Sequence, residues 1–161
     1  MTIPVALLLL TSLFTSESDA AFKSEDQWFQ FGESSYRLLN NEGEGYHERV
    51  VCEIECLNMG GNLTSVHSNE ENIFLTHLIT DQQDWNYWST WIGGDHMEEN
   101  QGEFRWSDGS SWDFEAWNEN QQEQGFGCVM MGLHSNPGTW AVDYCEHSIY
   151  TKNCICKKVL M

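Results

Sequence analysis

The sequence predicts an α+β domain in which two helices precede a series of short strands and a long ordered loop. Three observations support this fold class. Apolar residues recur at helical spacing in the first half, short apolar runs separated by turn residues fill the second half, and six cysteines form an even set. The length of 161 residues is that of one domain. We expect this domain to cover residues 21–161.

The first twenty residues are predicted to be a secretory signal peptide. Residues 3–14 form an apolar run of twelve, which is shorter than the about 20 residues that a membrane-spanning helix needs. No Lys or Arg precedes the run, but small residues at Ser18 and Ala20 fit cleavage after Ala20. The competing interpretation is a buried N-terminal strand or helix. We therefore expect a signal peptide at 1–20 and a secreted, extracellular protein without membrane insertion.

The charge balance excludes several classes of partner. The chain has 7 Lys+Arg against 25 Asp+Glu, which gives a formal net charge of -18. Nucleic-acid binding needs a clustered basic face, and attraction to anionic membranes needs basic segments. Hydrophobic residues make up 40% of the chain and include 8 Trp, which is too much apolar mass for a disordered acidic tail. We expect an acidic globular domain that does not bind nucleic acid.

The first helix is predicted over residues 47–59. Two glycines follow it, and its apolar residues recur at helical spacing: Val50, Ile54 and Leu57. Cys52 and Cys56 are four residues apart, so both lie on one side of this helix. Residues 62–66 then form a candidate strand.

The second helix is predicted to begin at Ser68. Glu71 follows three residues later, so that Ser68 caps the helix and Glu71 reaches back in a capping box. The apolar residues of the helix are Ile73, Leu75, Leu78 and Ile79. The pattern fades near Thr80 into a polar segment.

The second half is predicted to consist of short strands. The candidate strands cover residues 91–92, 103–106, 128–131, 139–142 and 153–157. The connection over residues 107–127 is long for a compact domain, and a loop of that length is usually functional or disordered. Its aromatic residues argue against disorder. We therefore expect an ordered, functional loop.

The six cysteines are predicted to form three disulfide bonds. They stand at positions 52, 56, 128, 145, 154 and 156, in a chain that we expect to enter an oxidising compartment. Zinc binding is the alternative, but the spacings within 52–56 and 154–156 do not match the usual zinc-finger patterns. Six cysteines allow fifteen pairings, and the sequence pattern leaves them open.

Taken together, these residues resemble the C-type lectin-like domain family. The resemblance covers residues 27–158 and is especially close to secreted fish lectins of the ladderlectin and type II antifreeze group. As an ordered set the matching motifs are highly specific: the helix with Cys56, Gly60-Gly61-Asn62-Leu63, Ser68-x-x-Glu71, Trp91-Ile92-Gly93-Gly94, the run from Phe104 to Gly109, Phe114, Trp117, Cys128-Val129, Trp140, Cys145 and Cys156.

The resemblance implies the disulfide pairing. Family members have the bridges that correspond here to Cys56–Cys156 and Cys128–Cys145. The remaining two cysteines, Cys52 and Cys154, are then expected to pair with each other.

The resemblance also identifies where a calcium ion and a sugar bind in other members. Calcium needs six to eight oxygen ligands. The family's ligand triplet in the long loop corresponds to Asn118-Glu119-Asn120, and an acidic ligand position falls on Phe126. After Trp140 the family has two oxygen ligands, but this chain has Ala141 and Val142, with Asp143 one residue later. We expect no metal site or cofactor unless Asn118, Asn120 and Asp143 converge on calcium.

We therefore expect a non-enzymatic recognition protein that binds a glycan or protein ligand through its long loop. The sequence contains no catalytic motif such as H-E-x-x-H or G-x-S-x-G. One alternative is a calcium-dependent lectin with a rearranged site, and another is a protein that binds ice or mineral. The candidate ligand-binding residues are Asn118, Glu119, Asn120, Gln121, Asp143 and Trp88. Most tryptophans are expected in the core.

A single glycosylation sequon is present. Asn62-Leu63-Thr64 matches the N-x-[ST] pattern, which marks Asn62 as a candidate for N-glycosylation in a secreted protein. We expect this sequon at the junction between the first helix and the following strand. The sequence leaves open whether the asparagine is accessible or buried there.

Overall fold

A computed structural model of the protein describes residues 27–40, 48–82, 89–96, 102–119, 125, 127–133, 136–146, 148–149 and 151–160. The expected signal peptide at residues 1–20 lies outside these ranges. Within them, no helix is both long enough and apolar enough to cross a membrane.

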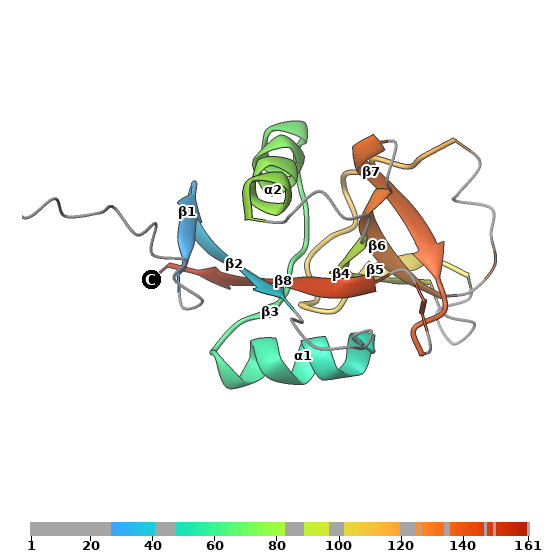
Figure 1. The fold of residues 1–161 in the computed structure, drawn as a ribbon, viewed down its shortest axis with the longest axis horizontal. Helices are drawn as coiled ribbons and strands as arrows, with labels where there is room; N and C mark the ends of the chain where they lie inside the picture. The colour runs from blue at the N-terminus through green and yellow to red at the C-terminus, as the bar shows by residue number, and fades with distance from the viewer. Residues whose placement is uncertain are drawn as a thin grey trace, which may run out of the picture.

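One mixed sheet organises the fold (Figure 1). The C-terminal strand β8 is central because β2, β3 and β4 all pair with it. β4 and β8 run parallel, and the other strand pairs are antiparallel. The main path runs in the order β1 (Phe29–Phe31), β2 (Ser34–Asn40), β8 (Thr151–Val159), β4 (Ser89–His96), β6 (Gly127–Leu133) and β7 (Asn136–Asp143), while β3 (Asn62–Leu63) pairs with β8 and β5 (Phe104–Trp106) with β4.

The two helices lie on opposite sides of β8, with α1 (Arg49–Asn58) on one side and α2 (Asn69–Gln82) on the other (Figure 1). Side chains alternate along a strand, so β8 contributes to two cores. Ile155 packs in the cluster that contains the α2 residues Leu75 and Leu78. Cys154 and Cys156 pack in the second cluster, which contains the α1 cysteines.

All three expected disulfide bonds are present. Cys52–Cys154 and Cys56–Cys156 join α1 to β8, and Cys128–Cys145 joins the start of β6 to the residues after β7. These are the pairings that the family resemblance implied. The first two bridges are buried side by side between helix and sheet.

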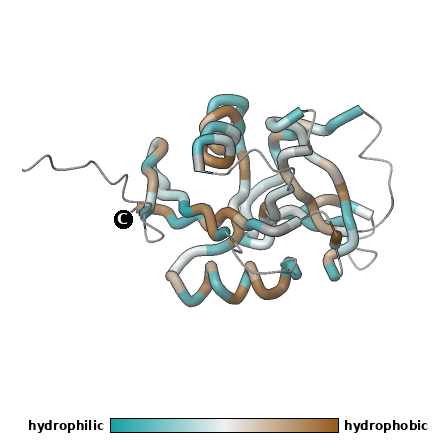
Figure 2. The backbone as a smooth tube through the Cα atoms, viewed as in Figure 1, coloured by the Kyte–Doolittle hydropathy of each residue, from teal (hydrophilic) through white to brown (hydrophobic). Residues whose placement is uncertain are grey.

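The apolar stripe of α1 faces outward. Val50, Ile54 and Leu57 recur at helical spacing, yet their exposed fractions are 53%, 53% and 54%. Cys52 and Cys56 are fully buried instead, because the two disulfides fix which side of the helix meets the sheet. Figure 2 shows the resulting hydrophobic residues along this outer helix. Helical periodicity therefore predicted the helix, and its buried side is the one that carries the two cysteines, which the sequence placed together.

The cap of α2 follows the predicted capping box with one difference. Ser68 Oγ accepts a hydrogen bond from the Glu71 N–H at 3.1 Å, as expected. Glu71 Oε2 accepts instead from the N–H of His67, one residue before the cap, at 2.8 Å. Its Oε1 accepts from the Tyr36 hydroxyl at 2.5 Å and from Lys157 Nζ at 2.8 Å. Glu71 thus ties α2 to β2 and β8 as well as closing the helix end.

The predicted strands of the second half are confirmed within β4 to β8, each with longer or shorter bounds. The candidate strand at residues 62–66 shortens to the two residues of β3. Strands β1 and β2 were not predicted. Among the described tryptophans, Trp91, Trp106 and Trp140 are at most 2% exposed, as expected for core residues.

Candidate functional site

The first part of the long loop, residues 107–119, ends along the free edge of β7, and we call residues 116–119 the loop end. The N–H of Asn118 donates to the carbonyl of Trp140 at 2.9 Å, and the N–H of Trp140 donates to the carbonyl of Ala116 at 2.7 Å. Trp117 and Trp140 thereby form a parallel bridge. Because β7 is the last strand of the main path, these bonds satisfy edge groups that could otherwise recruit another chain. The loop end is therefore fixed to a rigid element.

Trp140 holds the loop, the sheet and α2 together. Its side chain is fully buried, and Nε1 donates to Asn72 Oδ1 on α2 at 2.9 Å. The Asn72 amide in turn donates to the carbonyl of Gly138 at 2.8 Å, so both polar ends of Asn72 are satisfied. Edge-on ring contacts at 5.6–5.9 Å surround Trp140, from Trp106, Trp112, Phe114 and Trp117.

A row of half-buried aromatic rings continues from this core toward the surface. Phe104 stacks on Trp112 at 5.1 Å and on His96 at 4.2 Å, and its ring lies 4.8 Å from that of Trp117. Trp112 Nε1 donates to Glu115 Oε1 at 2.7 Å. Rings that are half-buried and held by neighbours present a rigid apolar surface beside polar groups. This is the kind of surface that a partly apolar ligand requires.

The start of the long loop is fixed by Asp108. Its Oδ2 accepts from Ser65 Oγ at 2.6 Å, and its Oδ1 accepts from the Ser110 hydroxyl at 2.6 Å and N–H at 2.9 Å. Burial on its own raises the pKa of Asp108. The hydrogen bonds from Ser110 and Ser65 and the charge of Lys157 outweigh it, and the pKa lies below its ordinary value. The ionised carboxylate is thus part of the folded loop.

Ser65, His67 and Asp113 have the residue types of a catalytic triad. His67 Nε2 lies 3.0 Å from Ser65 Oγ, and His67 Nδ1 lies 2.7 Å from Asp113 Oδ1. However, Ser65 is only 1% exposed, and its hydroxyl donates to Asp108. A nucleophile must reach its substrate and pass its proton to the base. The cluster therefore connects the long loop to the segment before α2 and does not form a nucleophilic site.

Two of the candidate ligand-binding residues lie at the fixed loop end. Asn118 is half-buried, and its Oδ1 accepts a hydrogen bond from Asn136 Nδ2, at the start of β7, at 3.3 Å. Glu119 follows in an exposed turn. Asn120, Gln121 and Trp88 lie outside the described residues.

Asp143 lies at the other end of β7. The Asn118 backbone bonds to Trp140, and Asp143 lies three residues further along β7, about 10 Å at 3.3 Å per residue, while the Asn118 side chain turns the other way, to Asn136 at the start of the strand. The pairing of β6 and β7 is continuous from Cys128↔Asp143 to Met131↔Trp140, so no bulge turns Asp143 toward the face of Val142. Its carboxylate accepts from the Tyr144 N–H at 2.8 Å and from Ser148 Oγ at 2.6 Å. Asn118 and Asp143 therefore do not converge.

The described residues do not fit the family's calcium site. Ala141 and Val142 offer no side-chain oxygen and are 0% and 7% exposed. Asn118 is paired with Asn136, and Asp143 bonds locally. Two separated oxygen groups fall short of the six to eight that calcium needs. The condition that Asn118 and Asp143 converge is thus not met.

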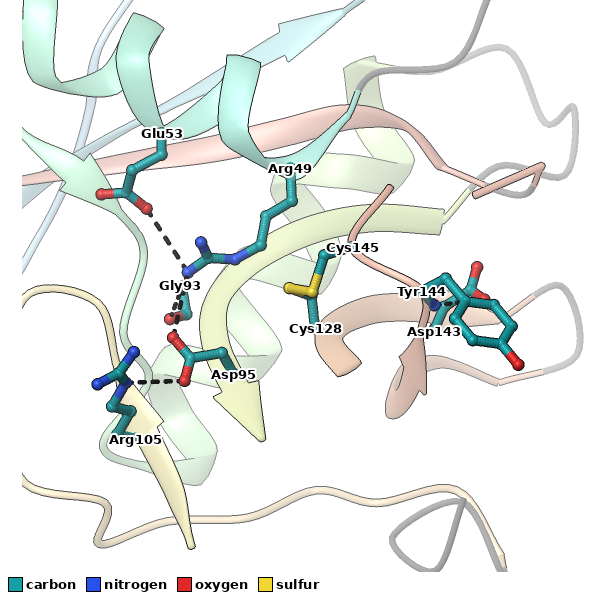
Figure 3. The surroundings of a disulfide bond; sticks show 9 residues. All are labelled: Arg49, Glu53, Gly93, Asp95, Arg105, Cys128, Asp143, Tyr144 and Cys145. Carbon is teal, nitrogen blue, oxygen red and sulfur yellow. Dashed lines mark hydrogen bonds and ion pairs between the residues drawn. A yellow bond between two sulfur atoms is a disulfide. The ribbon is translucent and has the colours of Figure 1, made fainter. Parts of the chain in front are cut away.

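An ion-pair network links α1 to β4 and β5, beside the Cys128–Cys145 bridge (Figure 3). Arg49 Nη2 lies 3.6 Å from Glu53 and 3.9 Å from Asp95, and it donates to the Gly93 carbonyl at 3.2 Å. Arg105 Nε donates to Asp95 Oδ1 at 2.8 Å. Burial lowers the pKa of Arg49, while the charges of Glu53 and Asp95 oppose the shift. The pair of Arg49 with Asp95 was not predicted, because no local pattern connects residues 46 positions apart.

Comparison with known proteins identifies relatives of this chain. A family model described as the lectin C-type domain matches residues 47–158. A lectin of Pleurodeles waltl is 30% identical over 129 residues, covering 75% of this chain and 72% of the relative. The galactose-specific lectin nattectin of Thalassophryne nattereri is 39% identical over 80 residues, covering 50% of this chain and 49% of nattectin. Some relatives are much longer: the chain spans 64% of the CD302 antigen of Bos taurus and 4% of the human versican core protein.

Solved structures share the fold. The carbohydrate-recognition domain of cow CD23, solved in the presence of a GlcNAc2Man3 oligosaccharide, is 28% identical with a TM-score of 0.65 and covers 84% of this chain and 95% of that chain. The calcium-independent C-type lectin SPL-2 from Saxidomus purpuratus is 26% identical with a TM-score of 0.65, covering 81% and 90%. A calcium-independent type II antifreeze protein, 24% identical with a TM-score of 0.67 over 83% and 92%, resembles this chain in fold alone.

The family model covers most of the chain, and the helices, sheet and disulfide bonds match what the resemblance implied. The chain therefore belongs to the C-type lectin domain family, whose members include carbohydrate-binding lectins.

Proposed function

We propose that this chain is a secreted, non-enzymatic recognition protein that binds carbohydrate through the end of its long loop, without the family's usual calcium ion. The observation that carries the proposal is the amide pair of Asn118 and Asn136, fixed at the loop end by backbone hydrogen bonds to β7.

The amide pair matches the chemistry of a sugar. When Asn136 donates to Asn118 Oδ1, Asn118 keeps both of its own N–H donors, and Asn136 keeps its carbonyl oxygen and one N–H. These groups present donors and an acceptor side by side, as adjacent hydroxyls of a pyranose require. Trp117 precedes Asn118 in the chain and is half-buried, so the part of its ring that stays exposed adds apolar surface to the loop end for a sugar ring. Because backbone bonds to β7 hold the loop end, little ordering is required on binding.

Two comparisons support a glycan as the ligand. The related domain of cow CD23 was solved in the presence of an oligosaccharide, and SPL-2 is described as a calcium-independent C-type lectin. Secretion is supported by three disulfides, which persist in oxidising compartments. A non-enzymatic role is supported by the burial of Ser65, whose hydroxyl donates to Asp108.

A glycan array probed in the presence of a chelator tests the proposal. We expect the purified chain to capture at least one class of glycan, and Asn118→Ala or Asn136→Ala to weaken capture about fivefold, since each neutral hydrogen bond contributes about 1 kcal/mol. Asn58→Ala is the matched control, because Asn58 is an exposed asparagine at the end of α1. Capture that survives both loop substitutions contradicts this site, and capture that disappears with the chelator contradicts calcium independence.

A further inference from the structure

We propose that Asn62 carries an N-linked glycan whose first sugar lies in the groove between β3, β8 and the start of the long loop. The inference rests on the proposed function in one respect, since modification requires entry into the secretory pathway. Asn62-Leu63-Thr64 is the single sequon of the sequence.

The strand pairing turns Asn62 away from the buried cysteines. In β3, Asn62 pairs with Lys157 and Leu63 pairs with Cys156. Leu63 is fully buried in the cluster with the α1 disulfides. Because successive side chains of a strand point to opposite faces, Asn62 points to the other face, toward the long loop. It is half-buried, so part of its amide reaches solvent.

Space is open beside Asn62. A groove of about 410 Å³ is lined by three segments, Gly60–Asn62, Asp108–Ser110 and Lys157–Val159. Gly60 and Gly109 both have a φ of +78°, and a Cβ placed on either would meet no atom within 4 Å. The walls on these two sides are thus backbone only. A pyranose can enter the groove without displacing a side chain at either glycine.

The amide of Asn62 has no protein partner within the described part of the chain. By contrast, Asn72 on α2 has its oxygen and its nitrogen bonded to protein groups. Attachment of a sugar to Asn62 Nδ2 therefore breaks no hydrogen bond of the fold. Asp108 and Ser110 line the same groove, and oxygen lone pairs that they do not use can accept hydrogen bonds from the hydroxyls and acetamide of an N-acetylglucosamine.

The modification must occur before β3 pairs with β8 and Thr64 becomes buried. Thr64 is fully buried in the folded chain, and its hydroxyl donates to the carbonyl of Ser65. β3, however, pairs only with β8, whose residue Lys157 emerges 95 positions after Asn62. At about 5–20 residues per second, that interval lasts roughly 5 to 20 seconds. During it the sequon has no strand partner, and Cys56–Cys156 is still open.

The chemical step is a group transfer from an activated glycan. The donor is a lipid-pyrophosphate-linked oligosaccharide of the secretory pathway. Nδ2 of Asn62 forms a bond to C1 of the first N-acetylglucosamine as the bond from C1 to the pyrophosphate oxygen breaks. The lipid pyrophosphate leaves with the electron pair, and one amide proton is lost. The groove lies beside β8 near the C-terminus, whereas β7 stands at the other side of the fold (Figure 1), so the ligand-binding loop end stays open.

Expression of the full chain in cultured animal cells tests the inference. We expect the secreted protein to migrate faster after treatment with a peptide N-glycosidase, and mass spectrometry to find Asn62 converted to Asp. Asn62→Gln should remove the difference, whereas Thr64→Ser, which keeps the sequon, should preserve it. Disulfide content measured on each variant separates loss of the glycan from loss of the fold.

The outcomes distinguish this inference from the proposed function. A secreted, disulfide-bonded chain at its unmodified mass overturns the inference alone. An unmodified chain retained in the cytosol overturns both. A secreted, modified chain that captures no glycan on the array supports the modification of Asn62 and contradicts the carbohydrate-binding proposal.

Discussion

The backbone N–H of Asn118 donates to the carbonyl of Trp140 at 2.9 Å, which fixes the end of the long loop to the last strand of the sheet. Related lectins that bind sugar through calcium use the metal ion to hold the same part of the loop, as the resemblance implies. In this chain the amide pair with Asn136 and the rings around Trp140 supply that support. We propose that protein contacts, rather than an ion, shape this surface.

Trp140 should be the residue whose loss destabilises the fold most. Truncation of a buried aromatic residue typically costs 3–5 kcal/mol, so we expect Trp140→Ala to reduce the free energy of unfolding by about 4 kcal/mol. Trp140→Phe keeps much of the ring contact but leaves Asn72 Oδ1 without its donor, and it should cost about 1–3 kcal/mol. Urea unfolding of the oxidised proteins measures both values. Equal losses for the two variants would show that the hydrogen bond to Asn72, and not the packing, dominates.

The two disulfides of α1 should be strongly non-additive. Cys52–Cys154 and Cys56–Cys156 close nearly the same loop, with separations of 102 and 100 residues. A loop of that length constrains the unfolded chain by about 4.7 kcal/mol. Once one bridge is closed, the second removes little further chain entropy. We therefore expect either bridge to be replaceable by an alanine pair at modest cost, and both together to cost about 4–5 kcal/mol more.

A double-mutant cycle by thermal or urea unfolding checks this expectation. Replacement of Cys128–Cys145, which closes a much shorter loop of 17 residues nested within the other two, is the additive control. Additivity between the two α1 bridges would contradict the entropic explanation.

Asp108 should make the fold sensitive to acid. Its native pKa lies below the ordinary value of 3.8, so the ionised carboxylate stabilises the native state above that pH. This contribution is lost as the pH falls through the lowered native pKa. Asp108→Asn should therefore destabilise the protein at neutral pH and have a smaller effect near pH 3. Asp81→Asn, at an exposed position of α2, is the control. A penalty for Asp108→Asn that is the same at both pH values would contradict this role.

Local patterns in the sequence predicted most of the elements. Both helices and the strands from β4 to β8 follow periodicity and turn residues that act over a few positions. β2 was missed because its pairing partner, β8, lies more than 100 residues later, and its buried residues Ser34 and Ser35 carry no apolar signal. The buried side of α1 likewise depends on a distant partner. Its cysteines, bonded to β8, outweigh the apolar spacing of Val50 and Ile54.

Only the site residues that lie within the family motifs could be predicted from the sequence. The position of Asn118 at the loop end followed from the resemblance, but its partner Asn136 did not. The polar cluster that fixes the loop joins Ser65 to Asp108, 43 residues apart, and His67 to Asp113, 46 residues apart. Such contacts depend on how the loop folds back over β3 and α2, which no spacing within the sequence encodes. Asp143, by contrast, follows the strand alternation that the sequence pattern implied.

A thermal melt of the oxidised chain, in excess calcium and then in chelator, measures directly whether a calcium ion stabilises the fold. When the free calcium concentration is 100 times the dissociation constant, binding stabilises the native protein by about 2.7 kcal/mol. This raises the Tm by roughly 5–10 °C for a domain of this size. Because Ala141 and Val142 provide no ligands and Asn118 is already paired, we expect the same Tm in both solutions. A clear rise of Tm in calcium would contradict calcium-independent folding of the loop and would show that a metal ion, not the protein alone, holds it.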